Sequence, residues 1–137
     1  MAYELFEHGA DVGVRGTGRS PAEAFEGAAT ALTAILLDPG VVEAVEAVEI
    51  ACEAPDLDLL LVDWLNALIY EMATRGLVFG RYEVEIAGGT LRGTAWGEKV
   101  DRTRHELAAE PKGATYTEAR VAEGPDGTWT AQCIIDV

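Results

Sequence analysis

The stretch Asp56–Gly97, DLDLLLVDWLNALIYEMATRGLVFGRYEVEIAGGTLRGTAWG, predicts a helix that leads directly into an antiparallel hairpin. The helix begins near Asp56 and reaches Gly76, a residue suited to a helix C-terminal cap. Residues 82–86 then alternate apolar and charged side chains, and Gly88-Gly89 supplies a two-residue turn into Leu91–Gly97. The apolar stripe of the helix consists of Leu57, Leu60, Leu61, Trp64, Leu65, Leu68 and Met72.

A second helix is predicted upstream, between Ser20 and the Asp38-Pro39-Gly40 stop signal. Ser20 and Glu23 form a capping box, and Pro21 occupies the first helical position. Both helices are expected to be apolar on one side only, so each should pack on something flat. The apolar positions of this helix are Phe25, Ala28, Ala29, Leu32, Ile35 and Leu36.

Several further segments have the pattern of short strands. Ala114–Ala122 and Thr128–Val137 are joined by a loop rich in turn formers, which predicts a second hairpin. Val41–Glu53 carries glutamates at a helical period, but its second half alternates and is predicted as a strand. We therefore expect an α+β fold in a single domain spanning 1–137. Short, mainly antiparallel strands would form a sheet or two-sheet sandwich with two amphipathic helices packed on it.

The composition narrows the classes of function. Acidic residues number 24 against 10 basic ones, giving a net charge of −14. This balance disfavours direct nucleic-acid binding, because phosphate contacts need a basic patch. No apolar run is long enough for a signal peptide or a membrane span, which favours a cytoplasmic protein. Cys52 and Cys133 lie apart among apolar residues and are predicted as inert core thiols, with a disulfide or a reactive site as the alternative.

The stretch Glu7–Val14, EHGADVGV, places His8 three residues before Asp11, with a glycine two residues to either side of that aspartate. Asp136 lies at the other end of the chain, beside the main-chain carboxylate of Val137, and points away from the more apolar face of its strand. If the two strands are neighbours, three oxygen donors meet and would suit Ca²⁺ or Mg²⁺ better than Zn²⁺. Alternatively, Asp11 caps a turn and Asp136 is solvated.

Other polar and aromatic residues have less certain roles, and most of these have more than one interpretation. His8 could be a ligand, a proton carrier or a local hydrogen-bonding group. His105 closes the basic run 102–105, which either contacts a phosphate or a partner or forms a solvated loop. Trp64 and Tyr70 are expected to take part in helix packing rather than base stacking.

The signature His8–Val14 resembles the opening H-x-A-D-V/I-G motif of the archease family. The resemblance covers essentially the whole chain in order, although Gly113 and Thr117 replace residues that are common in the family. Its other segments are Ala22–Phe25, Leu60–Asn66, Gly97-Glu98, His105, Lys112–Tyr116 and Ile135–Val137.

This resemblance implies an accessory protein rather than an enzyme. Archeases assist the RtcB-type RNA ligase of tRNA splicing and RNA repair, promoting its GTP-dependent guanylylation and its multiple turnover. RNA and GTP would therefore be reached only through the ligase. The family's metal site carries over to Asp11, Asp136 and Val137, with Ca²⁺ as the expected ion and Mg²⁺ or Mn²⁺ as alternatives. Its functional lysine, which assists the ligase in trans, carries over to Lys112.

Two other classes of function stay open. A stand-alone metal-dependent hydrolase would use His8, Asp11 and Asp136, but the chain has no second ligand-rich motif such as HExxH. A general chaperone or binding module would need an exposed apolar surface, and no surplus apolar stretch is present.

Overall fold

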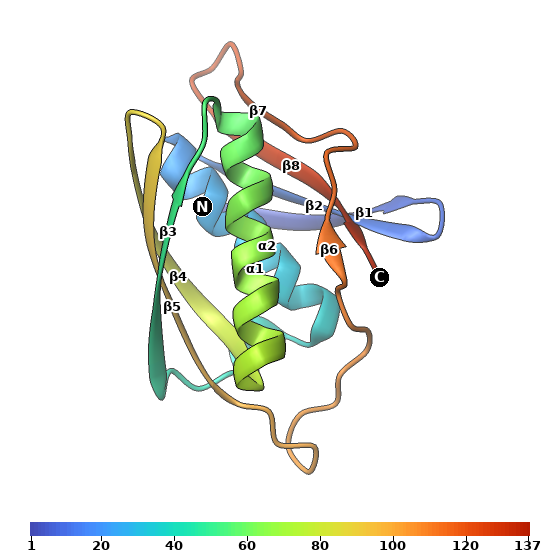
Figure 1. Cartoon of the computed structure of the whole chain (residues 1–137). Helices are drawn as coiled ribbons and strands as arrows, with labels where there is room; N and C mark the ends of the chain where they lie inside the picture. Colours follow the sequence, from blue (N-terminus) through green and yellow to red (C-terminus); the bar gives the residue numbers. More distant parts are fainter.

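Two antiparallel sheets and two long helices make up the computed structural model, which describes all 137 residues (Figure 1). The predicted α+β class, with mainly antiparallel strands, is confirmed. In chain order the elements are β1 (Ala2–His8), β2 (Asp11–Gly18), α1 (Pro21–Leu36), a 3-10 turn (Pro39–Val41), β3 (Glu46–Glu53), α2 (Leu57–Arg75), β4 (Leu77–Ala87), β5 (Thr90–Lys99), β6 (Gly113–Ala114), β7 (Arg120–Glu123) and β8 (Trp129–Asp136).

The larger sheet brings the two ends of the chain together. Its strands follow the order β1-β2-β8-β6, and β7 pairs with β8 next to β6. The smaller sheet, at the left of Figure 1, has the order β3-β5-β4. Every pairing is antiparallel. Because β2 and β8 are direct neighbours, the opening and closing segments of the sequence form adjacent strands.

Helix α1 begins as predicted but is enclosed more fully than a one-sided helix. The Glu23 N–H donates to Ser20 Oγ at 3.2 Å, which is one half of the predicted capping box; the Glu23 carboxylate accepts the Arg19 N–H at 3.3 Å in place of the Ser20 N–H. The expected single apolar face is wrong for α1, since buried residues surround most of the helix. The helix contacts strands of both sheets, and its many alanines let them approach closely.

Helix α2 agrees more closely with its predicted pattern. The Leu59 N–H donates to Asp56 Oδ1 at 2.9 Å, and Gly76 ends the helix with a left-handed φ of 64°. Trp64 is fully buried, and its Nε1–H donates to the Phe25 carbonyl at 3.2 Å. The packing role predicted for Tyr70 is wrong, because its side chain is 65% exposed on the outer side of α2.

The strand predictions are confirmed with one exception. Val48 and Ile50 are buried in β3, and Gly88 and Gly89 form the β4–β5 turn with φ values of 57° and 83°. The continuous strand expected over Ala114–Ala122 is wrong, since only its two ends are strands. The Thr115 N–H still donates to the Ile134 carbonyl of β8 at 3.0 Å, and the chain then leaves the sheet through a turn in which Glu118 has a φ of 53°.

Both cysteines are free thiols. Cys133 is buried, and its thiol donates to the Thr115 carbonyl at 3.1 Å. Burial raises the pKa of Cys133 to about 11. Cys52 is half-buried, and partial burial also raises its pKa. The prediction of an inert core thiol is thus confirmed in full for Cys133 and in part for Cys52.

Neither α1 nor α2 combines the length and apolar character that crossing a membrane requires.

Candidate functional site

Adjacent strands align His8, Asp11 and Asp136 in one row across the larger sheet. His8 and Asp11 are cross-strand partners on β1 and β2. Val12 is paired with Ile135, so Asp11 lies across from Asp136 at the end of β8. Directly opposed side chains on antiparallel strands have Cβ atoms about 5 Å apart and share a face of the sheet.

This row lies on the outer face of the sheet. A Cβ at Gly16 would point into the Ala24 carbonyl of α1, so the even-numbered residues of β2 face the helix. Val14 accordingly belongs to the core, and Asp11 points to the opposite side. On β8, Cys133 and Ile135 belong to the core, which leaves Asp136 on the outer face as predicted.

Lys112 and Val137 lie at the same end of the sheet. The Lys112 N–H donates to the Asp136 carbonyl at 2.7 Å, and the next residue pairs with Asp136 as part of β6. The Lys112 side chain is exposed. Figure 1 shows the C-terminus beside β6. Three strands thus bring the predicted residues Asp11, Lys112, Asp136 and Val137 together, and we call this group the acidic tip.

No cationic side chain forms an ion pair with either aspartate of the acidic tip. Neighbouring carboxylates repel each other unless a cation or a hydrogen-bond donor lies between them. No three His, Cys, Asp or Glu side chains form a group that could hold a metal. A cation here would therefore take Asp11, Asp136, the main-chain carboxylate of Val137 and water. Oxygen donors of this kind fit Ca²⁺ or Mg²⁺.

His8 has a partner that the sequence did not reveal. Its Nε2 lies 3.0 Å from Glu118 Oε2, and both side chains are largely exposed. Gln132 Nε2 donates to the Glu118 carbonyl at 3.5 Å, so the turn 115–119 lies beside the outer face of β8. Glu118 could not be found by pattern, because its place depends on a left-handed backbone in a segment rich in strand-forming residues.

Asn66 was assigned no chemistry from the sequence, which left helix capping of another segment or a buried hydrogen bond as its possible roles. From α2, its side-chain amide makes two hydrogen bonds with the main chain of Ala114 in β6. The only signal in the sequence was its place in the segment Leu60–Asn66 that resembles the archease family.

His105 lies away from the acidic tip and is only 3% exposed. Its Nε2 lies 3.2 Å from Glu98 Oε2, and its Nδ1 accepts the Asp101 N–H at 2.8 Å. Arg104 also contacts Glu98. The solvated loop predicted for this basic run is therefore wrong at His105, which is also closed to a phosphate. The N–H of Glu43, with help from His105 and Arg104, lowers the pKa of Glu98.

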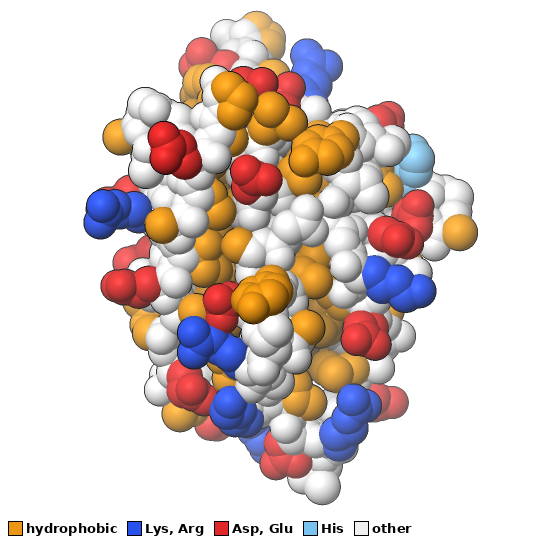
Figure 2. Space-filling view, viewed as in Figure 1, with side chains coloured by type: hydrophobic (Ala, Val, Ile, Leu, Met, Phe, Trp, Pro, Cys, Tyr) orange, Lys and Arg blue, Asp and Glu red, His pale blue; other side chains and the backbone are white.

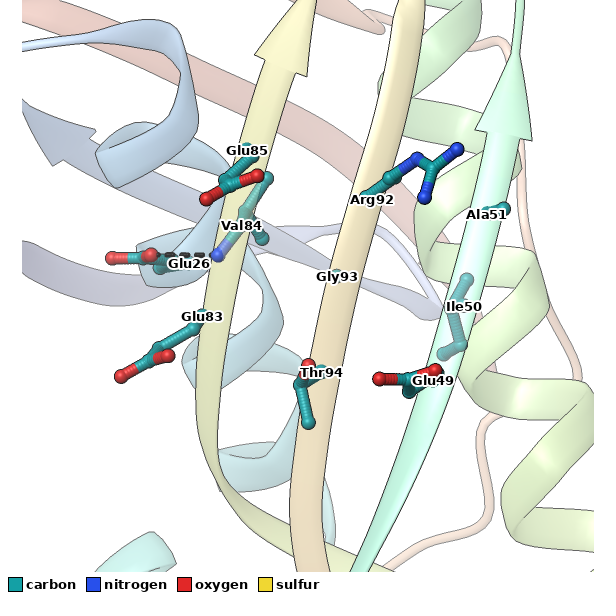
Figure 3. Close-up of a pocket in the computed structure, with 10 residues that line it drawn as sticks. All are labelled: Glu26, Glu49, Ile50, Ala51, Glu83, Val84, Glu85, Arg92, Gly93 and Thr94. Atoms are coloured by element: carbon teal, nitrogen blue, oxygen red, sulfur yellow. Dashed lines mark hydrogen bonds between the residues drawn. The ribbon is translucent and has the colours of Figure 1, made fainter.

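A groove on the outer face of the smaller sheet contains none of the predicted residues (Figure 3). The carboxylates of Glu26, Glu83 and Glu85 gather along β4, and Arg92 projects from β5. Glu26 Oε2 accepts the Val84 N–H at 2.8 Å and so closes the free edge of β4. Desolvation by burial raises the pKa of Glu26. The position of the Glu26 carboxylate in the groove is therefore explained by the structure, without a ligand.

Comparison with known proteins gives one consistent result. Residues 3–137 match the model of the Archease protein family (MTH1598/TM1083). The chain is 39% identical to Protein archease of Pyrococcus furiosus and 35% identical to Protein archease of Sulfurisphaera tokodaii, and each match covers 98% of both chains.

Solved structures agree with the fold. The solution structure of Methanobacterium thermoautotrophicum protein 1598 is similar with a TM-score of 0.87 and 31% identity, over 99% of both chains. The crystal structure of an archease described as a possible chaperone, from Thermotoga maritima, is similar with a TM-score of 0.64. That match has 19% identity and covers 98% of this chain and 96% of the other, so it bears on the fold alone.

Proposed function

Because the chain belongs to the archease family, we propose that it is an accessory protein that activates an RtcB-type RNA ligase. It promotes the GTP-dependent guanylylation of the ligase and its multiple turnover in tRNA splicing and RNA repair, and it is not itself an enzyme. It works in the cytoplasm and reaches RNA and GTP only through the ligase. The observation that carries this proposal is the convergence of Asp11, Lys112, Asp136 and Val137 at one end of the larger sheet.

The carboxylates of the acidic tip act as a cation-binding group in this proposal. Asp11 and Asp136 provide two oxygen ligands from neighbouring strands, and the main-chain carboxylate of Val137 provides the third. Ca²⁺ is the proposed ion, with Mg²⁺ or Mn²⁺ as alternatives. When bound, the ion supplies positive charge beside the phosphates that the ligase handles. The rigid β2–β8 pairing holds the two aspartates ready, so little ordering is needed on binding.

Lys112 is the proposed residue that acts in trans. Its side chain is exposed and makes no ion pair, while its main chain is held by Asp136. An ammonium group is a compact charge on a flexible stem, which suits it to reach a phosphate bound to another protein. We assign it to phosphate contact at the nucleotide site of the ligase.

The overall charge supports a protein partner over direct RNA binding. A net charge of −14 repels a polyanion but attracts the basic surface that a ligase needs for RNA and GTP. On the face shown in Figure 2, hydrophobic side chains are scattered among charged ones. An apolar groove between α2 and the segment 100–111, lined by Ile69, Met72 and Leu107 among others, leaves the alternative of a general chaperone open.

A multiple-turnover ligation assay tests the proposal. The substrates are one RNA with a 2′,3′-cyclic phosphate end and one with a 5′-hydroxyl, incubated with the cognate ligase and GTP. We expect several products per ligase molecule with this protein and about one or fewer without it. A product yield unaffected by the protein would refute the proposal. Incubation of the protein with RNA but without ligase tests the hydrolase alternative. Turnover of RNA by the protein alone would support that alternative.

A further inference from the structure

The side chain of Asn66 takes the place of a neighbouring strand for β6. Asn66 Nδ2 donates to the Ala114 carbonyl at 3.2 Å, and the Ala114 N–H donates to Asn66 Oδ1 at 2.8 Å. One side-chain amide thus satisfies both main-chain groups of a single residue. Only one orientation of the amide gives this pairing, because the carbonyl needs a donor and the N–H needs an acceptor.

The opposite edge of β6 contacts Asp136 of the acidic tip. Gly113 pairs with Asp136, and the Lys112 N–H donates to the Asp136 carbonyl at 2.7 Å. Strand β6 has only two residues, shorter than most strands, and on this edge β8 also accepts the Thr115 N–H at the Ile134 carbonyl, at 3.0 Å. Asn66 fastens this short strand to a helix of 19 residues, whose position is set by the buried core.

We propose that Asn66 is a positioning residue for Lys112 and Asp136. It holds β6 between α2 and β8, so that the Lys112 main chain stays bonded to Asp136 and its ammonium starts from a defined place. Removing the amide leaves the N–H and C=O of Ala114 without their partner, and β6 then loses its fixed position. The importance of this position for ligase activation rests on the function proposed above.

Asp58 provides a matched control on the same helix. Its Oδ1 accepts the Val121 N–H at 2.7 Å, so it also links α2 to a strand that pairs with β8. That strand is β7, which pairs with residues 129–132 in the first half of β8 rather than with Asp136. Asp58→Ala therefore removes an anchor between α2 and the sheet without touching β6.

Amide hydrogen exchange followed by NMR tests the proposal on the full chain. In Asn66→Leu, which keeps a similar volume, we expect the Lys112 amide to exchange at least ten times faster, while amides between β2 and β8 are unchanged. Asp58→Ala should leave the Lys112 amide as in the unaltered protein. An unchanged Lys112 exchange rate in Asn66→Leu would overturn the proposal, as would an equal increase in Asp58→Ala.

A second variant and a ligation assay complete the test. If Asn66→Leu fails to fold, Asn66→Asp keeps the acceptor for the Ala114 N–H and removes the donor, and it should also accelerate Lys112 exchange. In the ligation assay, Asn66→Leu should lose as much stimulation as Lys112→Ala, and Asp58→Ala should lose none. If the unaltered protein gives no stimulation, the proposed function fails, but the exchange rates still decide whether Asn66 positions Lys112.

Discussion

Asp11, the first residue of β2, lies across from Asp136, the last residue of β8, because Val12 and Ile135 are cross-strand partners. Two carboxylates from opposite ends of the sequence are thereby held on the same face of one sheet. Neither has an ion-pair partner in the protein. In the function proposed above, a cation binds between these two carboxylates and offsets their repulsion.

Asp11→Asn and Asp136→Asn should each weaken Ca²⁺ binding at least tenfold in a calorimetric titration, because each removes one charged ligand. Without calcium, neither should lower stability, since relief of repulsion between opposed like charges is worth about 0.2–1 kcal/mol. Glu49→Gln, in the groove of the smaller sheet, is the control and should bind Ca²⁺ normally. Normal Ca²⁺ affinity in both aspartate variants would contradict the proposed metal site.

Gly16→Ala should destabilise the fold by about 1–3 kcal/mol, the usual cost of overpacking. A Cβ at Gly16 would collide with the main chain of α1 at Ala24 and Ala28, and main-chain atoms cannot rotate away. Gly124→Ala is the control, because its Cβ would lie 3.4 Å from Asp126 Oδ1, an ordinary contact. Urea unfolding of both variants measures the difference. Equal stabilities would show that β2 and α1 are not packed this closely.

Glu98 should make the stability depend on acid pH. Its pKa is lowered in the folded protein, first by the N–H of Glu43 and then by His105 and Arg104. Because the pKa of Glu98 is lower in the folded protein, its charged form stabilises the fold at pH values above the ordinary glutamate pKa of about 4.3. This contribution is lost as the pH falls below about 4.3 and through the pKa that Glu98 has in the folded protein. The stability difference between the unaltered protein and Glu98→Gln should therefore shrink in that range. A difference that stays constant would contradict the charged contact.

The two cysteines should differ in reactivity. With a pKa of about 11, roughly one Cys133 thiol in a thousand is ionised at pH 8, and it is also buried. Cys52 is only half-buried and should be alkylated first. Mass spectrometry after timed treatment with iodoacetamide at pH 8 measures both rates. Faster labelling of Cys133, or a disulfide between the two residues, would contradict the structure.

The features predicted best were those that depend on nearby residues. The start of α2 near Asp56, the stripe around Trp64 and the turn at Gly88-Gly89 each follow from local spacing or from backbone freedom, and all are present. Features that depend on distant packing were missed. Tyr70 lies next to the buried stripe of α2 but is exposed. For α1, the small alanine side chains gave no indication of how many sides of the helix are buried.

In the candidate site, too, contacts that need one strand pairing were predicted, and contacts that depend on distant packing were not. The proximity of Asp11 and Asp136 could be predicted because it needs only one pairing, between the opening and closing strands. The break at residues 115–119 could not, since Thr115, Tyr116 and Thr117 favour strands. Because that break was not predicted, the contact between His8 and Glu118 was not predicted either. The burial of His105 was hidden likewise, because its partner Glu98 lies on a strand of the smaller sheet.

In the proposed function, the acidic tip, which includes Lys112, acts on the ligase itself. The most direct measurement is the rate at which the cognate ligase becomes covalently labelled by radioactive GTP, with this protein or its Lys112→Ala variant added. We expect faster labelling with the unaltered protein and at least a tenfold loss of that stimulation with the variant, at equal folded stability. Labelling that is no faster with the unaltered protein, or equal stimulation by the variant, would contradict the proposed function.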